Sequence, residues 1–156
     1  MTSLYTKLIS GYVFPLQERL KQHTSVAVRK RMEESQWWSR ERIESLQLER
    51  LKALLEYAQI HVPYYRDVFQ SQGFRAQDVT NQSDLQRLPL LTKPLIRQNQ
   101  DRLKSEQAGP LARFNTGGSS GEPLIFFIGN ERVSHDVAAK WRATRWWGVD
   151  IGDPEI

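Results

Sequence analysis

The strongest constraint on the fold is a glycine- and serine-rich run, residues 116–123 (TGGSSGEP), that leads directly into an apolar segment. That segment, Leu124–Ile128, is aliphatic and aromatic and is followed by a Gly-Asn pair, which predicts a β-strand. A second candidate strand, Leu111–Asn115, precedes the run. The sequence therefore predicts a β-hairpin around a glycine loop.

Helical patterns dominate the chain before this hairpin. Ser39 is a candidate N-cap for a long helix in which apolar residues recur at helical spacing as far as Ala58. Pro63 is expected to end that helix and to open the next one, since proline is tolerated in a first turn. Gly73 is a natural C-terminal stop for this second helix.

Three weaker helical signals complete the N-terminal half. Residues Tyr5–Leu20 show faint helical periodicity that Gly11 and Pro15 are expected to interrupt. A short helical turn is expected at residues 83–88. Thr92 is expected to cap a helix that runs to about Leu103.

Beyond the hairpin, Asn130 is expected to cap a helix that Gly148 ends, and residues 149–156 are expected to lead into a new strand. One strand pair with one helix cannot cover both faces of a sheet. The expected class is therefore α/β: a helical N-terminal half, then a glycine-loop β-hairpin, then the start of a doubly wound sheet. The fold is expected to be a truncated part of a larger domain.

Composition excludes several classes of function. The chain has no cysteine, which excludes disulfides and thiolate zinc sites, and its three histidines lack metal-ligand spacing. Its net charge of +4 comes from interspersed signs, so nucleic-acid binding is not expected. No apolar run approaches the roughly 20 residues of a transmembrane helix. No export signal is evident, so a cytoplasmic location is expected.

The glycine-serine run has the chemistry of an anion-binding loop. Glycines let successive backbone N–H groups point into one concave nest, and hydroxyl groups add donors for phosphate oxygens. It is not a Walker A loop, because Glu122 and Pro123 stand where that motif needs lysine and a hydroxyl residue. A flexible linker has a similar composition, but the apolar strand directly behind the run argues against one. The candidate phosphate-binding residues are Thr116, Gly117, Gly118, Ser119, Ser120 and Gly121.

Four segments, in order, resemble one family. They are Leu54–Arg66 with its Val-Pro-Tyr-Tyr-Arg ending, Leu88–Lys93 with Leu-Pro and Thr-Lys, the run that starts at Thr116, and the turn Gly148–Asp153. Together they resemble adenylate-forming enzymes of the branch that contains phenylacetate–CoA ligases and capsular polysaccharide biosynthesis (CapK-like) proteins. The resemblance implies that residues 46–156 are the N-terminal portion of an AMP-binding domain, incomplete at its C-terminus. Residues 1–45 would be a helical N-terminal extension.

The resemblance also implies a two-step reaction. A carboxylate substrate would attack the α-phosphate of ATP, releasing pyrophosphate and forming an acyl-adenylate, and coenzyme A or another acceptor would then take the acyl group. Mg²⁺ would neutralise the phosphates, and the loop would hold the β- and γ-phosphates. The family's later catalytic elements have no counterpart here, so no catalytic residue is assigned. The chain is expected to be inactive without the missing C-terminal part of the same fold.

Two other interpretations remain open at this stage. One is a non-catalytic helical interaction module with an incidental glycine-serine turn. The other is a peripheral membrane protein that uses its N-terminal amphipathic stretch and its tryptophans. The pairs Trp37-Trp38 and Trp146-Trp147 are expected to pack in a core or between domains. Lys93 is expected to be partly exposed in a first helical turn.

Overall fold

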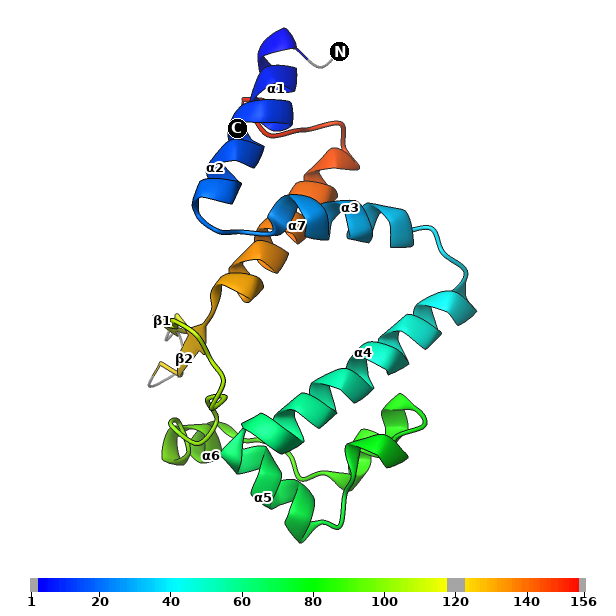
Figure 1. The fold of residues 1–156 in the computed structure, drawn as a ribbon, viewed down its shortest axis with the longest axis vertical. Helices are drawn as coiled ribbons and strands as arrows, with labels where there is room; N and C mark the ends of the chain where they lie inside the picture. Colours follow the sequence, from blue (N-terminus) through cyan, green and yellow to red (C-terminus); the bar gives the residue numbers. More distant parts are fainter. Residues whose placement is uncertain (1–2, 118–122, 155–156) are drawn as a thin grey trace. The chain divides into compact units, whose positions relative to one another are not determined.

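A computed structural model describes residues 3–117 and 123–154 of the chain. It is mostly helical, with one small antiparallel hairpin (Figure 1). The chain forms two compact units: unit 1 comprises Met1–Trp38 and Ile128–Ile156, and unit 2 comprises Ser39–Phe127. The predicted helical N-terminal half and the hairpin are confirmed.

Unit 1 begins with one continuous helical run made of α1 (Leu4–Leu8), a π-helical segment η1 (Ile9–Val13) and α2 (Phe14–Leu20). The prediction that Gly11 and Pro15 interrupt this helix is wrong. Gly11 lies inside the π turn, and Pro15 falls in the first turn of α2. A π turn accommodates an extra residue without ending a helix.

The core of unit 1 forms where α3 (Ser25–Ser35) packs beside α7 (Asn130–Arg145) (Figure 1). Trp141 is only 4% exposed; the Phe14 ring meets its edge at a centroid distance of 5.1 Å. The Arg29 guanidinium lies 4.3 Å from the centre of the same indole. The sequence did not predict α3, because little of it is buried and its apolar spacing is faint.

Helix α7 starts one residue differently from the prediction. Gly129 is its N-cap residue and makes no side-chain cap bond, so Asn130 is the first helical residue rather than the cap. Its end agrees with the prediction, because Gly148 takes a φ of +73° just beyond the last turn. Positive φ is the conformation that glycine adopts readily at helix C-termini.

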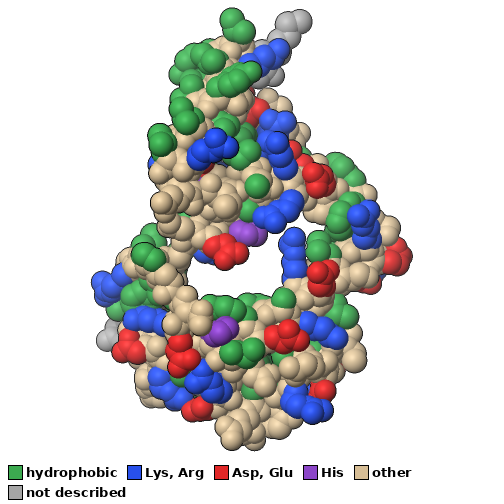
Figure 2. All heavy atoms as spheres, viewed as in Figure 1, with side chains coloured by type: hydrophobic (Ala, Val, Ile, Leu, Met, Phe, Trp, Pro, Cys, Tyr) green, Lys and Arg blue, Asp and Glu red, His purple; other side chains and the backbone are tan. Residues whose placement is uncertain are grey.

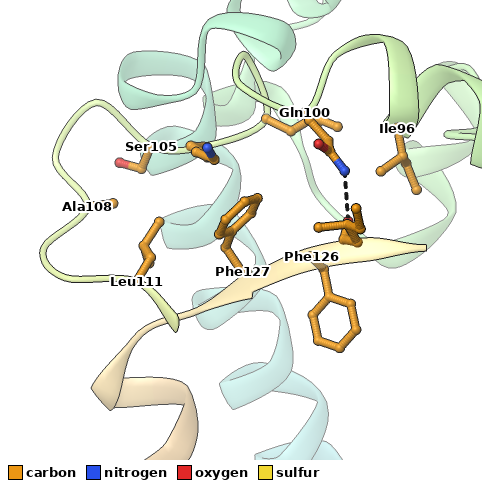
Figure 3. A pocket seen from close by; sticks show the side chains of 10 residues that line it. Ile96, Gln100, Ser105, Ala108, Leu111, Phe126 and Phe127 are labelled. Atoms are coloured by element: carbon orange, nitrogen blue, oxygen red, sulfur yellow. Dashed lines mark hydrogen bonds between the residues drawn. The ribbon is translucent and has the colours of Figure 1, made fainter. Parts of the chain in front are cut away.

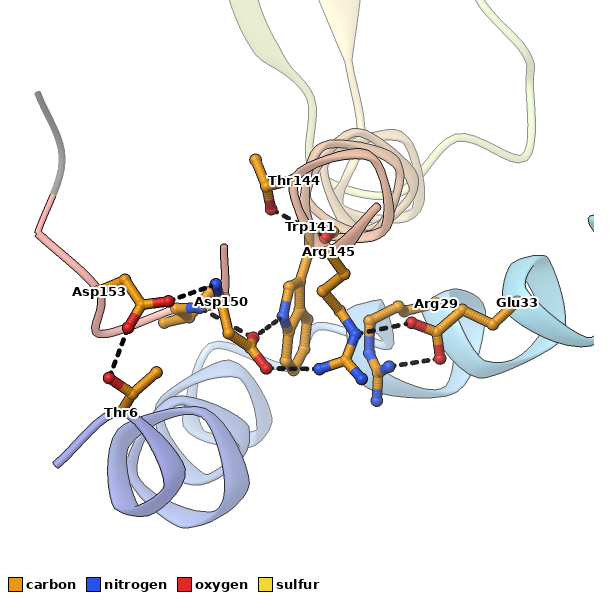
Figure 4. A network of polar contacts seen from close by, with 9 residues as sticks. Thr6, Arg29, Glu33, Trp141, Thr144, Arg145, Asp150 and Asp153 are labelled. Carbon is orange, nitrogen blue, oxygen red and sulfur yellow. Dashed lines mark hydrogen bonds and ion pairs between the residues drawn. The ribbon is translucent and has the colours of Figure 1, made fainter. Parts of the chain in front are cut away.

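The turn after α7 is held to the rest of unit 1 by a polar network (Figure 4). Asp150 accepts hydrogen bonds from the Trp141 indole N–H (2.6 Å) and from the Arg145 guanidinium (2.5 Å). Asp153 accepts from the Thr6 hydroxyl (2.6 Å) and from the Asp150 backbone N–H (2.8 Å). These bonds fix residues 150–153 against the N-terminal helix.

A buried carboxylate joins the second and third helices of unit 1. Glu18 is 2% exposed; it accepts hydrogen bonds from the Ser25 hydroxyl (2.6 Å) and pairs with His23 Nδ1 (3.1 Å). Nearby, the Thr24 backbone N–H donates to Ser134 Oγ of α7 at 3.0 Å. Because a buried polar group is tolerated only when it is hydrogen-bonded, this cluster fixes how α2 and α3 meet.

Unit 2 is built on the long helix α4 (Arg40–His61), followed at once by α5 (Pro63–Ser71). Three predictions are confirmed here: the Ser39 side chain caps α4, Pro63 opens α5, and Gly73 follows α5 with a φ of +56°. An apolar core lies against these helices. Its buried members are Leu55, Phe69, Phe74, Ala76 and Val79.

Short elements wrap this core: the 3₁₀ segments η2 (Ala76–Asp78) and η3 (Gln82–Arg87), and the helix α6 (Lys93–Gln98). The helical turn predicted at residues 83–88 is η3. Helix α6 ends earlier than the predicted Leu103, and Thr92 makes no side-chain cap bond. The chain is instead turned toward the α4–α5 junction, where Tyr64 N–H donates to the Arg102 carbonyl (3.0 Å).

Two other predictions need correction. Trp37 and Trp147 are 81% and 85% exposed, so these tryptophans are not core residues of unit 1. Trp146 is also exposed, and its indole N–H donates to Gln36. Residues 149–154 contain a turn at 151–152 and no strand, and the described part of the chain contains only the two-stranded sheet, without the start of a doubly wound one.

Candidate phosphate-binding hairpin

The glycine loop is carried by two paired strands, β1 (Ala112–Asn115) and β2 (Ile125–Ile128). Beyond the strands the pairing continues through one more residue pair. Thr116 N–H donates to the Leu124 carbonyl, and Leu124 N–H donates to Thr116 Oγ1, both at 3.0 Å. The base of the loop is therefore closed by a backbone bond and a side-chain bond between the same two residues.

Thr116 consequently has a structural role that the sequence did not predict. Its hydroxyl oxygen is an acceptor for the Leu124 N–H, which leaves the hydroxyl hydrogen able to donate to a ligand. Gly117, the next candidate, is exposed, and a Cβ built on it would meet nothing within 4 Å. The remaining candidates, Gly118, Ser119, Ser120 and Gly121, lie outside the described residues, so the anion nest stays a prediction.

Stacking also stabilises the hairpin. The rings of Phe114 on β1 and Phe126 on β2 lie 6.0 Å apart with an interplanar angle of 22°. Such cross-strand aromatic pairs favour one register of the two strands. The strands that present the loop therefore have a defined pairing, as a binding loop requires.

A pocket of about 300 Å³ lies on the other side of β2 (Figure 3). Phe127 faces this pocket, while Phe126 points to the opposite side of the strand (Figure 3). The Lys104 ammonium lies 4.0 Å from the centre of the Phe127 ring, and Gln100 Nε2 donates to the Ile125 carbonyl at 3.5 Å. Lys104 could not be predicted as a residue of this site, because a single lysine between helix and strand forms no pattern.

Other candidate groups lie elsewhere. Lys93 is exposed at the first position of α6, as expected, and its contact with phosphate remains untested. His61 is the last residue of α4, with its ring 4.7 Å from that of Tyr57. Within the described ranges, no three His, Asp or Glu side chains are grouped closely enough to hold a metal ion. Nor does any described helix have the length and apolarity needed to cross a membrane.

Comparison with known proteins finds partial similarities. The chain is 25% identical over 93 residues to Protein CapK of Staphylococcus aureus. It is 36% identical over 61 residues to the phenylacetate-coenzyme A ligase of Aromatoleum evansii. The resemblance inferred from the sequence is thereby confirmed as a partial similarity.

The similarity covers a limited part of each relative. It takes in 60% of this chain and 20% of CapK, and 39% of this chain and 14% of the ligase. The chain thus matches about a fifth of the first relative and about a seventh of the second. No family model matches the chain.

Proposed function

We propose that this chain supplies the phosphate-binding hairpin of an ATP-dependent ligase that forms acyl-adenylates. In that reaction a carboxylate attacks the α-phosphate of ATP, pyrophosphate leaves, and coenzyme A or another acceptor takes the acyl group. The observation that carries the proposal is the closed base of the loop. A linker would not be clamped between Thr116 and Leu124 at the end of a strand pair.

The loop would act on the leaving pyrophosphate. Backbone N–H groups and hydroxyls of residues 116–121 would donate to the β- and γ-phosphates and stabilise the charge that develops as the bond to the α-phosphate breaks. Donors held before the reaction need no rearrangement during it. The Thr116–Leu124 closure provides that fixed starting geometry.

Mg²⁺ fits the proposal only as a companion of ATP. The candidate residues 116–121 offer neutral donors rather than carboxylate ligands, and the described residues hold no group of metal ligands. The ion would therefore be bound by the phosphate oxygens and would neutralise their charge.

The assignment of segments follows from the same proposal. Residues 46–156 would be the N-terminal portion of an adenylation domain, with 1–45 as its helical extension. The carboxylate pocket and the later catalytic groups would lie in a C-terminal part of the same fold. Because ATP is supplied in the cytoplasm, the proposal includes a cytoplasmic location. The chain alone is expected to bind phosphate without catalysing adenylation.

Calorimetric titration of the chain with pyrophosphate and with Mg-ATP tests the proposal. Ser119→Ala combined with Ser120→Ala removes two hydroxyl donors and is expected to weaken binding about a hundredfold or more, since bonds to charged groups contribute about 1.5–3 kcal/mol each. The matched control is Ser45→Ala combined with Ser71→Ala, on exposed positions of α4 and α5. Absence of binding, or equal losses in both double variants, contradicts the phosphate-loop function.

A second test asks whether the enzyme is encoded at all. The nucleotide sequence that follows the codon for residue 156 is expected to continue in frame, or after one frameshift. It should encode a Tyr-Gly-x-Thr-Glu segment and a late lysine. Unrelated sequence after a genuine stop codon contradicts the ligase function and leaves only a phosphate-binding loop.

A further inference from the structure

The N-terminal helical run of unit 1 buries one side and exposes the other. On its buried side, Thr6 bonds to Asp153 and the Phe14 ring meets Trp141. Its exposed side carries a row of large apolar side chains (Figure 2), here called the N-terminal ridge. The ridge comprises Leu4, Tyr5, Leu8, Tyr12, Val13, Leu16 and Leu20, each at least 48% exposed.

The backbone keeps these residues in one row. Leu4, Leu8, Tyr12, Leu16 and Leu20 are spaced by four, and in an ideal α-helix that spacing drifts by about 40° at every step. The π-helical segment η1 lies in the middle of the row and winds less per residue, which offsets part of the drift. The π turn therefore helps to keep these five side chains on one face of the helical run.

The charges beside the ridge have one sign. Glu18 is the only acidic residue among residues 3–32, and it is buried and bonded to Ser25. The exposed polar surface of this stretch is consequently basic. Its exposed cations are Lys7, Arg19, Lys21, Lys30 and Arg31. Arg29 is not among them, because it is mostly buried and paired with Glu33.

We propose that the N-terminal ridge binds the surface of an anionic lipid membrane. An interfacial helix needs an apolar face for the headgroup boundary and basic residues beside it, and leucine with tyrosine suits that boundary. Each cation near an anionic surface adds about 1 kcal/mol. The helix would lie in the plane of the membrane surface, with the rest of unit 1 on the side that faces water.

A second copy of the chain is a poorer occupant. Two ridges placed together would bring two sets of five exposed cations close, with no exposed carboxylate in residues 3–32 to offset them. A charged row of this kind repels itself and attracts an anionic surface. A fluid headgroup layer also needs no complementary shape, so the ridge alone is sufficient.

The test is co-sedimentation of the 156-residue chain with vesicles made of equal amounts of phosphatidylglycerol and phosphatidylcholine. The disrupting variant combines Leu8→Glu with Leu16→Glu, at positions 54% and 59% exposed. The control combines Leu54→Glu with Ile60→Glu, at positions 63% and 60% exposed on α4. Both double variants add the same charge at apolar positions of the same exposure.

The ridge variant is expected to lose binding by about tenfold or more, because glutamate replaces apolar contact and repels anionic lipid. The control variant is expected to bind like the wild type, and added salt is expected to weaken binding. The proposal is overturned if the wild-type chain does not bind these vesicles or binds pure phosphatidylcholine vesicles equally well. It is also overturned if the two double variants lose binding equally. A wild-type dimer that only the ridge variant dissociates would also overturn it in favour of a second copy.

Discussion

Each of the two units is stabilised internally by a different kind of contact. Among the described residues, all four buried polar side chains lie in unit 1: Thr6, Glu18, Ser25 and Ser134. Unit 2 has six buried apolar residues and no buried polar one, again counted over the described chain. One unit thus depends on directional bonds and the other on buried apolar area.

This difference has a physical consequence for each unit. Apolar burial is non-directional and tolerates small shifts, so unit 2 should lose stability in proportion to the area or volume removed. A buried polar network is stable only when every member is satisfied, so unit 1 should respond sharply to the loss of one partner. Single substitutions in each unit can test that contrast.

The largest effect is expected from Phe69→Ala in unit 2. Phe69 is 1% exposed and touches Tyr65 and Phe74, so its removal leaves a cavity and should cost about 3–5 kcal/mol of unfolding free energy. Hydrogen exchange of the α4 and α5 amides measures this loss. Leu54→Ala, on the exposed side of α4, is the control and should stay within about 0.5 kcal/mol of wild type. Equal loss of protection in α3 and α7 would show that the units are not independent.

Glu18→Ala tests the polar counterpart. The substitution leaves the Ser25 hydroxyl and the His23 ring without their acceptor, and it should cost about 2–3 kcal/mol in unit 1. Hydrogen exchange of α3 and α7 is the measurement. Glu49→Ala, at an exposed position of α4, is the control. If Glu18→Ala leaves α3 and α7 as protected as before, the network is not what holds unit 1.

A smaller loss is expected from Gly152→Ala. Gly152 has a φ of +97°, and a Cβ there would lie 2.9 Å from Ile9 Cβ on the N-terminal helix. Positive φ and this crowding together should cost about 1–2 kcal/mol. Gly109→Ala is the matched control, because a Cβ there meets nothing within 4 Å. Equal stability of the two variants, by thermal unfolding, would mean that the turn is not docked on the helix.

The smallest effect is a difference in acid sensitivity. The Asp150 backbone N–H, and then the Thr6 hydroxyl, lower the pKa of the Asp153 carboxyl from its ordinary value. As the pH falls, the Asp153 carboxyl is therefore protonated in the unfolded chain before it is protonated in the folded chain. The stabilisation is complete above the ordinary aspartate pKa and is lost as the pH falls through the lowered one. Asp153→Asn should therefore reduce the fall in the unfolding free energy of unit 1 at acid pH. Urea unfolding at several pH values measures this dependence, and an unchanged dependence on pH would contradict the prediction.

Local rules predicted unit 2 better than unit 1. Ser39 as a cap, Pro63 as a helix start and Gly73 as a stop are decided by neighbouring residues, so their sequence signals were sufficient. Helix α3 was missed because its buried face contacts α7, which lies far along the chain.

The candidate site shows the same limit. Loop composition predicted a hairpin at the right place, and the strands β1 and β2 confirm it. The bond from Leu124 N–H to Thr116 Oγ1 could not be foreseen, because it depends on strand register. The position of Lys104 over Phe127 joins residues 23 apart across a turn that has no sequence signature.

The insertion of unit 2 within unit 1 affects how the chain folds during synthesis. The bond between Thr24 and Ser134 joins residues 110 positions apart, so this contact cannot form until both residues have been made. At about 5–20 residues per second, a ribosome needs on the order of 5–20 s to make that stretch. Unit 2 can fold within this interval, while the nascent N-terminal helix still exposes apolar side chains on both sides.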